Sequence, residues 1–195
     1  MTAISTNRGR RAIRTTFALG AVSLGLVALS ACEQPSPNAH FTLNSNTESR
    51  ETPADCYGHG DALGAERALS CTESNDDVPT FTTRAGDTFR VGVDPDVAED
   101  GWLLFVNGLL YDPEPFTTTY HSFSSDDLYR AAEQQQTTPG QAPQTENLRL
   151  NVVEVSDDYD EDEILSSQTQ EEYEERMFSS LDGVWNVELE PHQGH

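Results

Sequence analysis

The sequence predicts a mainly β protein, an antiparallel sandwich of about seven strands with short helices in the connections. Apolar residues alternate with polar ones at Phe89, Val91 and Val93, the pattern of a strand with one buried face. Asn107-Gly108 stands between two apolar runs, which is a strong hairpin signal because both residues tolerate positive φ. Short apolar segments separated by turn residues favour an immunoglobulin-like or cupredoxin-like sandwich, with a small open barrel as the alternative.

The first strand is expected at residues 40–44, where Phe41 and Leu43 share a face. The polar residues 45–55 are expected to form a loop. Asp61 is a candidate N-cap for a short helix over residues 62–70. Further strands are expected around residues 88–93, 102–110, 116–123, 147–155 and 184–190, with a helix at 124–136.

An acidic helical insert is expected at residues 157–181. Leu165, Tyr173, Met177 and Leu181 have helical spacing, with glutamates on the opposite face. This stripe is expected to pack on the sandwich, and a partner-binding helix face is the alternative.

The first 31 residues have the three parts of an export signal. Residues 7–14 carry four arginines and no acid, residues 15–30 are almost wholly apolar or small, and Ala31 precedes Cys32. The apolar run is shorter than the roughly 20 residues that a membrane helix needs. Residues 1–31 are therefore predicted to be a signal peptide, and Arg10-Arg11 leaves both the general and the twin-arginine export routes open.

The segment Leu29-Ser30-Ala31-Cys32 resembles the lipobox of bacterial lipoproteins. In that family the cysteine thiol receives a diacylglyceryl group, and the new amino terminus is often acylated too, as with palmitate. Each buried CH₂ contributes about 0.8 kcal/mol, so two or more chains anchor a protein stably. The resemblance implies lipidation of Cys32 and a place on the extracytoplasmic face of the cell membrane. The alternative is an ordinary secretory signal cut before a cysteine.

We expect one domain in the exported chain. Residues 32–38 contain two prolines and are predicted to be an extended tether. Residues 39–190 are predicted to form a single sandwich that includes the acidic insert, and residues 191–195 to form a flexible tail.

The exported chain is strongly acidic. Four of the 11 basic residues and none of the 34 acidic ones lie in residues 1–31, which leaves a formal charge of −27 on the rest. This charge argues against nucleic acid as a partner and against electrostatic docking on anionic lipid. All 11 of these basic residues are arginine, and none is lysine. Genomic nucleotide composition, adaptation to a salty exterior, or both would explain this choice.

Cysteine usage predicts a disulfide. The chain has three cysteines, Cys32, Cys56 and Cys71, and lipidation of the first leaves an even pair. In an exported protein such a pair favours a disulfide over two free thiols. The pair is 15 positions apart, so the closed loop would stabilise the fold by about 3 kcal/mol.

Two segments resemble a family of small actinobacterial (Streptomyces-like) lipoproteins with a domain of unknown function. They are residues 85–108, AGDTFRVGVDPDVAEDGWLLFVNG, and residues 182–190, DGVWNVELE. The lipobox and the two cysteines in the first third also fit that family. The resemblance implies an exported location and a fold, and it transfers no catalytic residue. The acidic insert departs from the shorter members.

No cofactor is expected, because the metal-site patterns are incomplete. A blue-copper site needs a free cysteine with histidines and usually a methionine, and the exported chain has Met177 but no spare cysteine. His59, with Asp61 two residues later, is a weak metal candidate, and a solvated loop histidine is favoured.

The acidic run contains a second weak metal candidate. Asp158, Asp160 and Asp162 have the spacing that begins a calcium loop. The sixth and twelfth positions are Glu163 and Thr169, where glycine and glutamate are needed. A solvated acidic run is therefore favoured over calcium binding.

The sequence has no recognisable catalytic motif, because Gly-x-Ser-x-Gly, Ser-x-x-Lys and a phosphate-binding glycine loop are all absent. Trp102 and Tyr111 are weak ligand-binding candidates. Trp102 alternates with Leu104 and Val106, which favours a place in the core.

These observations predict a non-enzymatic, lipid-anchored envelope protein that contacts another envelope protein or a cell-wall component. The alternative is a ligand-capture lipoprotein, an accessory in solute binding, which a deep pocket would favour. An unrecognised hydrolase ranks third, and a nucleophile within reach of a histidine would favour it.

Overall fold

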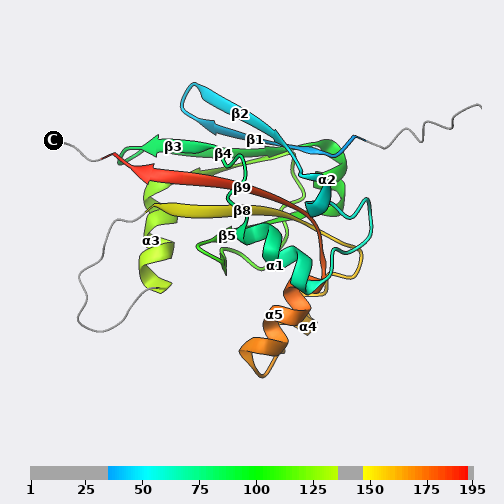
Figure 1. Ribbon diagram of the computed structural model, residues 1–195. Coiled ribbons are helices and arrows are strands. Elements are labelled where there is room, and N and C mark those ends of the chain that lie inside the picture. Colours follow the sequence, from blue (N-terminus) through cyan, green and yellow to red (C-terminus); the bar gives the residue numbers. More distant parts are fainter. Residues whose placement is uncertain (1–34, 136–146, 193–195) are drawn as a thin grey trace, which may run out of the picture. The chain divides into compact units, whose positions relative to one another are not determined.

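Two β-sheets pack face to face in the structure, which is a computed structural model that describes residues 35–135 and 147–192 (Figure 1). One compact unit comprises Gln34–His195. The expected signal peptide, Cys32 and the start of the tether lie outside the described residues, as does most of the predicted tail. The predicted β-sandwich is confirmed.

Sheet A has four antiparallel strands, and sheet B has five strands, of which one pair is parallel. The described residues therefore hold nine strands rather than about seven. The chain passes from β3 in sheet B directly to β4 in sheet A, so these successive strands form no hairpin. In spatial order, sheet A contains β2 (Asn46–Glu51), β1 (Asn38–Leu43), β4 (Thr88–Val93) and β7 (Tyr120–Ser124). Sheet B contains β3 (Thr80–Thr83), β9 (Leu181–Pro191), β8 (Leu148–Val155), β5 (Trp102–Val106) and β6 (Leu109–Leu110).

The two sheets bury an apolar layer between them. Phe89, Val91 and Val93 point into this layer from β4, as their alternation predicts. Trp102 and Trp185 enter it from sheet B and are 0% and 2% exposed, so both belong to the core.

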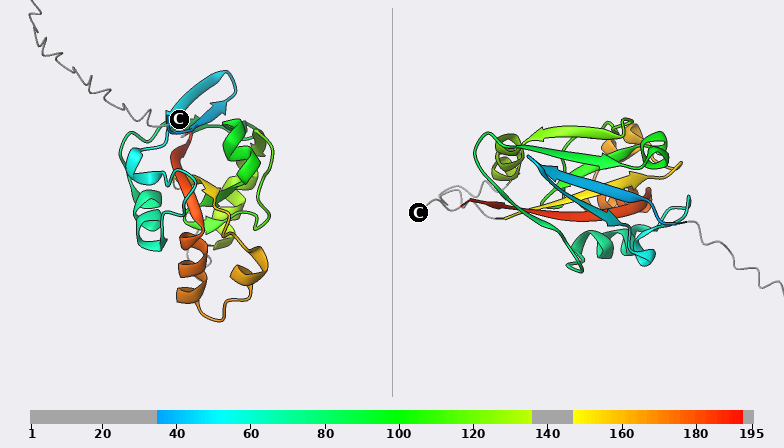
Figure 2. Two further views of the ribbon diagram at one scale, coloured as in Figure 1. Left: turned by 90° about the vertical axis from the view of Figure 1, so that its right-hand side faces the viewer. Right: turned by 90° about the horizontal axis from the view of Figure 1, so that it is seen from above.

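A second apolar layer covers the opposite face of sheet B, where α1 (Ala65–Glu73), α4 (Glu161–Leu165) and α5 (Gln170–Ser179) lie (Figure 2). Phe105 of β5 and Phe178 of α5 stack there with ring centroids 6.0 Å apart. No helix among the described residues lies over the outer face of sheet A. The helices α2 (Pro95–Asp100) and α3 (Ser125–Gln135) lie at opposite ends of the sandwich (Figure 1).

The prediction of a loop at residues 45–55 is wrong, because residues 46–51 form β2. This strand has the sequence NTESRE, which contains no apolar residue that could reveal it. As an edge strand it needs no buried side chains, and its pairing with β1 specifies it.

The predicted cap of the first helix is also wrong. This helix, α1, begins at Ala65, and Gly64 rather than Asp61 is its N-cap, without a side-chain capping bond. Its N-cap glycine has φ of 82°, a conformation that costs other residues free energy. Cys71 lies inside the helix, whereas Cys56 belongs to the short 3₁₀ helix η1 (Ala54–Cys56).

The acidic insert contains two helices rather than one. The hydroxyl of Thr169 accepts a hydrogen bond from the backbone N–H of Glu172 at 3.1 Å and so starts a new helix. Leu181 is already the first residue of β9, and Leu165 is 55% exposed. The predicted apolar stripe of a single helix therefore does not form.

The fold begins slightly before the predicted end of the tether at residue 38. The carbonyl of Pro37 accepts hydrogen bonds from the backbone N–H and the hydroxyl of Thr52, at 3.1 and 3.0 Å. It also accepts one from the indole N–H of Trp185 at 3.3 Å. The first strand thus starts at Asn38, close behind Cys32 in the sequence.

Candidate functional site

The predicted disulfide between Cys56 and Cys71 is present, with Cα atoms 5.7 Å apart. It joins η1 to α1 in the layer that covers sheet B. A surface hollow of about 790 Å³ lies beside it, lined by Leu63, Arg67 and other residues of this layer. Arg67 donates hydrogen bonds to the carbonyls of Asp55 and Ala54, so its guanidinium serves to hold η1.

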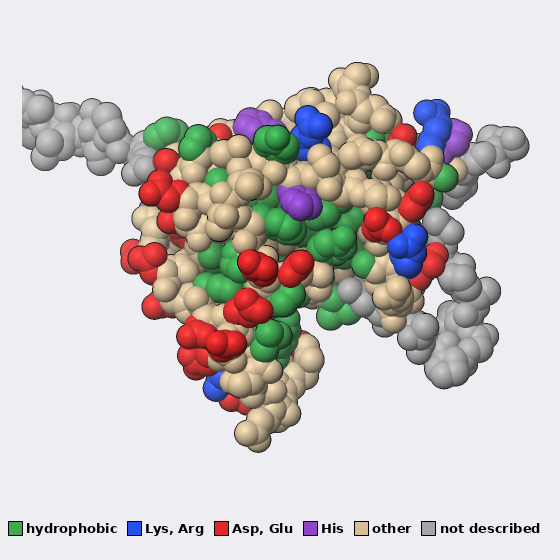
Figure 3. All heavy atoms as spheres, turned by 180° about the vertical axis from the view of Figure 1, so that it is seen from behind, with side chains coloured by type: hydrophobic (Ala, Val, Ile, Leu, Met, Phe, Trp, Pro, Cys, Tyr) green, Lys and Arg blue, Asp and Glu red, His purple; other side chains and the backbone are tan. Residues whose placement is uncertain are grey.

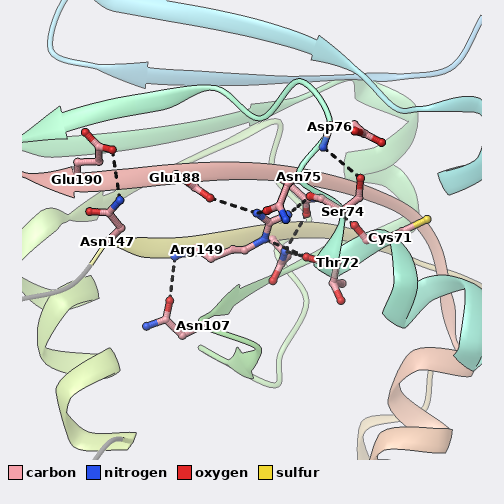
Figure 4. A network of polar contacts seen from close by, with 12 residues as sticks. Cys71, Thr72, Ser74, Asn75, Asp76, Asn107, Asn147, Arg149, Glu188 and Glu190 are labelled. Atoms are coloured by element: carbon pink, nitrogen blue, oxygen red, sulfur yellow. Dashed lines mark hydrogen bonds and ion pairs between the residues drawn. The ribbon is translucent and has the colours of Figure 1, made fainter.

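A polar network fixes the end of α1 to sheet B (Figure 4). Arg149 of β8 donates hydrogen bonds to the carbonyls of Thr72 and Ser74, and it forms an ion pair with Glu188 at 3.3 Å. Asn186 of β9 donates to the carbonyl of Cys71 at 2.8 Å. These carbonyls lie at the C-terminal end of the helix, beyond the reach of regular helical hydrogen bonds, although that of Cys71 also accepts one from the backbone N–H of Ser74 at 3.3 Å. The network therefore has a structural role and brings no reactive group together.

The two ligand-binding candidates meet in one aromatic cluster between β6 and β7. The ring of Trp102 lies 4.6 Å from that of Phe116, and the ring of Tyr111 lies 5.5 Å from that of Phe123. His121 joins the cluster, 4.4 Å from Phe116. Hydrophobic side chains gather on this side of the molecule, and acidic ones gather around α4 and α5 below (Figure 3). Trp102 is wholly buried, so only Tyr111 of the pair can reach a ligand.

The metal candidates do not assemble into a site. His59 is an exposed loop residue whose ring packs on Tyr57 at 4.6 Å. Asp160 caps α4 by accepting a hydrogen bond from the N–H of Glu163, and Asp162 lies within that helix. The backbone N–H of Asp158 donates to Ser156 at 3.3 Å. In the part of the chain that the structure describes, no three histidine, cysteine, aspartate or glutamate side chains could hold a metal ion.

Two buried carboxylates lie at the α2 end of the sandwich. Glu154 of β8 and Asp182 of β9 are 2% and 3% exposed, and each has one carboxylate oxygen without a hydrogen-bond partner. Burial, and then the charges of Asp182 and Asp100, raise the pKa of Glu154 to about 8. Burial also raises the pKa of Asp182, although Gly60 donates a hydrogen bond to its other oxygen at 2.9 Å. The raised pKa favours the protonated form of Glu154, which can donate a hydrogen bond to Asp100.

The outer face of sheet A, which we call the open face, brings together a serine, a histidine and an aspartate. The Nδ1 atom of His40 lies 2.7 Å from the hydroxyl of Ser49 on the neighbouring strand. The Nε2 atom of His40 lies 3.6 Å from a carboxylate oxygen of Asp94. This order matches that of a nucleophile, a base and an orienting acid.

Acyl transfer also needs hydrogen-bond donors for the developing oxyanion. The backbone N–H groups around Ser49 belong to strands, and such groups lie in the plane of the sheet rather than pointing out of its face. Ser49 also lies on an exposed strand face. We therefore infer that Ser49 and Asp94 hold the ring of His40 in place, and that the three residues do not form a hydrolytic centre.

Beside His40 the open face has a position without a side chain. Gly92 of β4 pairs with His40 on one side and with Tyr120 on the other. The guanidinium of Arg90 lies 5.6 Å from the centre of the Tyr120 ring and donates a hydrogen bond to Ser122 at 3.3 Å. Tyr120 is nevertheless 61% exposed.

Comparisons with known proteins assign no family. No family model and no curated protein matches the chain. Among solved structures, fibronectin(III)-like modules of CbhA from Clostridium thermocellum match with a TM-score of 0.31 and 7% identity, over 60% of this chain and 93% of that one. The resemblance to actinobacterial lipoproteins stays a prediction, and the sandwich fold rests on the strand pairing described above.

Sequence reasoning did not find the open face. The alternation of β1 places His40 on its polar side, which is the only signal that the sequence offers. Ser49 lies in a strand that was not expected, and Tyr120 pairs with Gly92, which lies 28 positions earlier in the sequence. Only the strand order brings these residues together.

Proposed function

We propose that this protein is an exported, lipid-anchored envelope protein whose sandwich domain binds a partner at the open face. The observation that carries the proposal is the position of Cys32. The lipobox-like segment ends at this cysteine, and the compact domain begins at Gln34. A signal peptide could therefore be removed and Cys32 acylated without loss of any part of the domain.

The disulfide further supports an exported location. The disulfide between Cys56 and Cys71 is buried within the domain, and such bonds persist in oxidising compartments. No helix of the described residues is long and apolar enough to span a membrane. Attachment through acyl chains on Cys32 would supply the membrane affinity.

The open face supports a role in binding because it is the sheet face that the helices leave uncovered. The outer face of sheet B is buried beneath α1, α4 and α5, whereas every strand side chain of the open face is exposed or half-buried. In an anchored protein, this face would be available to a partner in the envelope.

The anchor is tested by replacing its cysteine. In cells that express Cys32→Ala, we expect the protein to leave the membrane fraction, because no acyl chain can be attached. The readout is an immunoblot of membrane and soluble fractions. Ser36→Ala, four residues further along the chain, is the control and should stay with the membrane. Retention of Cys32→Ala in washed membranes would overturn the proposed anchor.

A further inference from the structure

We propose that the open face binds a sugar chain that carries carboxylate groups, with the chain lying over Gly92 between His40 and Tyr120 and its carboxylate on Arg90. This inference deepens the proposed function, on which it rests, by naming the class of partner. The strand positions that form the open face are Asn38, His40, Thr42, Thr47, Ser49, Glu51, Thr88, Arg90, Gly92, Tyr120, Ser122 and Ser124.

Gly92 marks the place of closest approach. A glycine inside a strand weakens it and often occurs where a ligand or another backbone comes close. Positive φ does not explain this glycine, because Gly92 is not among the residues of the described chain with that conformation. Packing does not require it either, since an added Cβ would meet its nearest atom, the Cβ of His40, at an ordinary 3.4 Å. A residue with a side chain would therefore fit at position 92, and the glycine leaves that space above the strand open.

The side chains on both sides of this space are held in place. His40 is fixed between Ser49 and Asp94, at 2.7 and 3.6 Å. Tyr120 is held by the guanidinium of Arg90, which lies over its ring. Holding side chains before a ligand arrives reduces the entropy lost on binding. The space above Gly92 thus has one oriented ring on each side.

The polarity of the open face favours a sugar over a peptide. Seven of its twelve positions carry hydroxyl groups, among them Thr42 and Thr47, which bond each other at 2.9 Å. Peptide-binding surfaces rely on pockets for apolar anchors, and Tyr120 is the one large apolar ring among these strand positions. Hydroxyl groups and an exposed aromatic ring match the hydroxyl-rich edges and apolar faces of sugar rings.

The charge of the open face favours an acidic sugar. Glu51 is the single acid among its strand positions, with Asp94 just beyond β4, although the full sequence has 34 acids. No carboxylate of the described chain lies within ion-pair distance of Arg90. Its guanidinium is therefore available for a carboxylate, which arginine can bind through two parallel hydrogen bonds.

A pair of disaccharides tests the inference on the purified full-length protein. N-acetylglucosaminyl-N-acetylmuramic acid carries a carboxylate, and N,N′-diacetylchitobiose has the same sugar backbone without it. We expect isothermal titration calorimetry to show binding of the first and at least tenfold weaker binding of the second, since a hydrogen-bonded charge contributes about one power of ten or more.

Two variants locate the site. Arg90→Gln should lower the affinity for the acidic disaccharide about tenfold, to that for chitobiose. Gly92→Val should abolish binding while the protein stays folded, because valine suits strands better than glycine. Arg130→Gln removes the same charge from α3, where Arg130 pairs with Asp127, and should bind as the wild type does.

Three outcomes would overturn the inference: equal binding of both disaccharides, no binding at millimolar concentration, or binding that neither Arg90→Gln nor Gly92→Val changes. None of them bears on the anchor, which the fractionation of Cys32→Ala tests separately. A membrane-bound wild type that binds neither disaccharide would therefore refute the sugar partner and leave the anchoring proposal standing.

Discussion

At the scale of single residues, the carboxylate of Glu154 matters for stability because it is enclosed within the fold, where its charge is costly. Glu154 shares the alternation of β8, which gives no sign that its carboxylate is enclosed. The charges of Asp182 and of Asp100 in α2, both distant in the sequence, raise its pKa further.

Glu154 makes stability depend on pH. Its pKa is raised from 4.5 to about 8 in the folded protein, mainly by burial, so folding favours the protonated form. The resulting stability is fully present below pH 4.5 and is lost as the pH rises through about 8. Glu154→Gln mimics the protonated acid, so we expect it to be more stable than the wild type at pH 9, on the order of 4 kcal/mol, and similar at pH 4.

Urea unfolding of both proteins at several pH values measures this difference. Glu171→Gln, on the exposed surface of α5, is the matched control and should keep the wild-type dependence on pH. Parallel stability curves for the wild type and Glu154→Gln would contradict the assignment.

At the scale of elements, apolar patterns in the sequence predicted most strands. The other strands are specified by hydrogen-bonded pairing with a neighbouring strand. The hairpin at Asn107-Gly108 formed as expected, with φ of 50° and 80° at its two residues. Short-range patterns do not specify β2, which is wholly polar, or the parallel contact between β3 and β9. The open face was missed for the same reason, since its residues come from four strands.

The disulfide is the covalent link between two of these elements, η1 and α1. The double variant Cys56→Ser, Cys71→Ser should lose about 3 kcal/mol of unfolding free energy, because the loop of the unfolded chain is no longer closed. Urea titration with and without dithiothreitol provides the measurement. Reductant should shift the midpoint of the wild type to that of the double variant and leave the variant unchanged. A wild-type midpoint that ignores reductant would show that the bond does not stabilise the fold.

At the scale of the whole molecule, acidic charge is uneven. The chain beyond residue 31 carries a formal charge of −27, yet few of its acids lie on the open face. Most of the acids must therefore repel one another across the remaining surface. Long-range repulsion of this kind weakens as salt shortens the Debye length, from about 30 Å at 0.01 M to about 8 Å at 0.15 M.

Stability should accordingly rise with salt. We expect the melting temperature to increase when potassium chloride is raised from 0.01 to 0.2 M, and to change little from there to 0.5 M, since screening acts mainly at low salt. Differential scanning calorimetry provides the measurement, with sucrose of equal osmolality as the control for solvent exclusion. A melting temperature that stays constant below 0.2 M would mean that the carboxylates are too widely spaced to repel one another, and that adaptation to a salty exterior does not explain the composition.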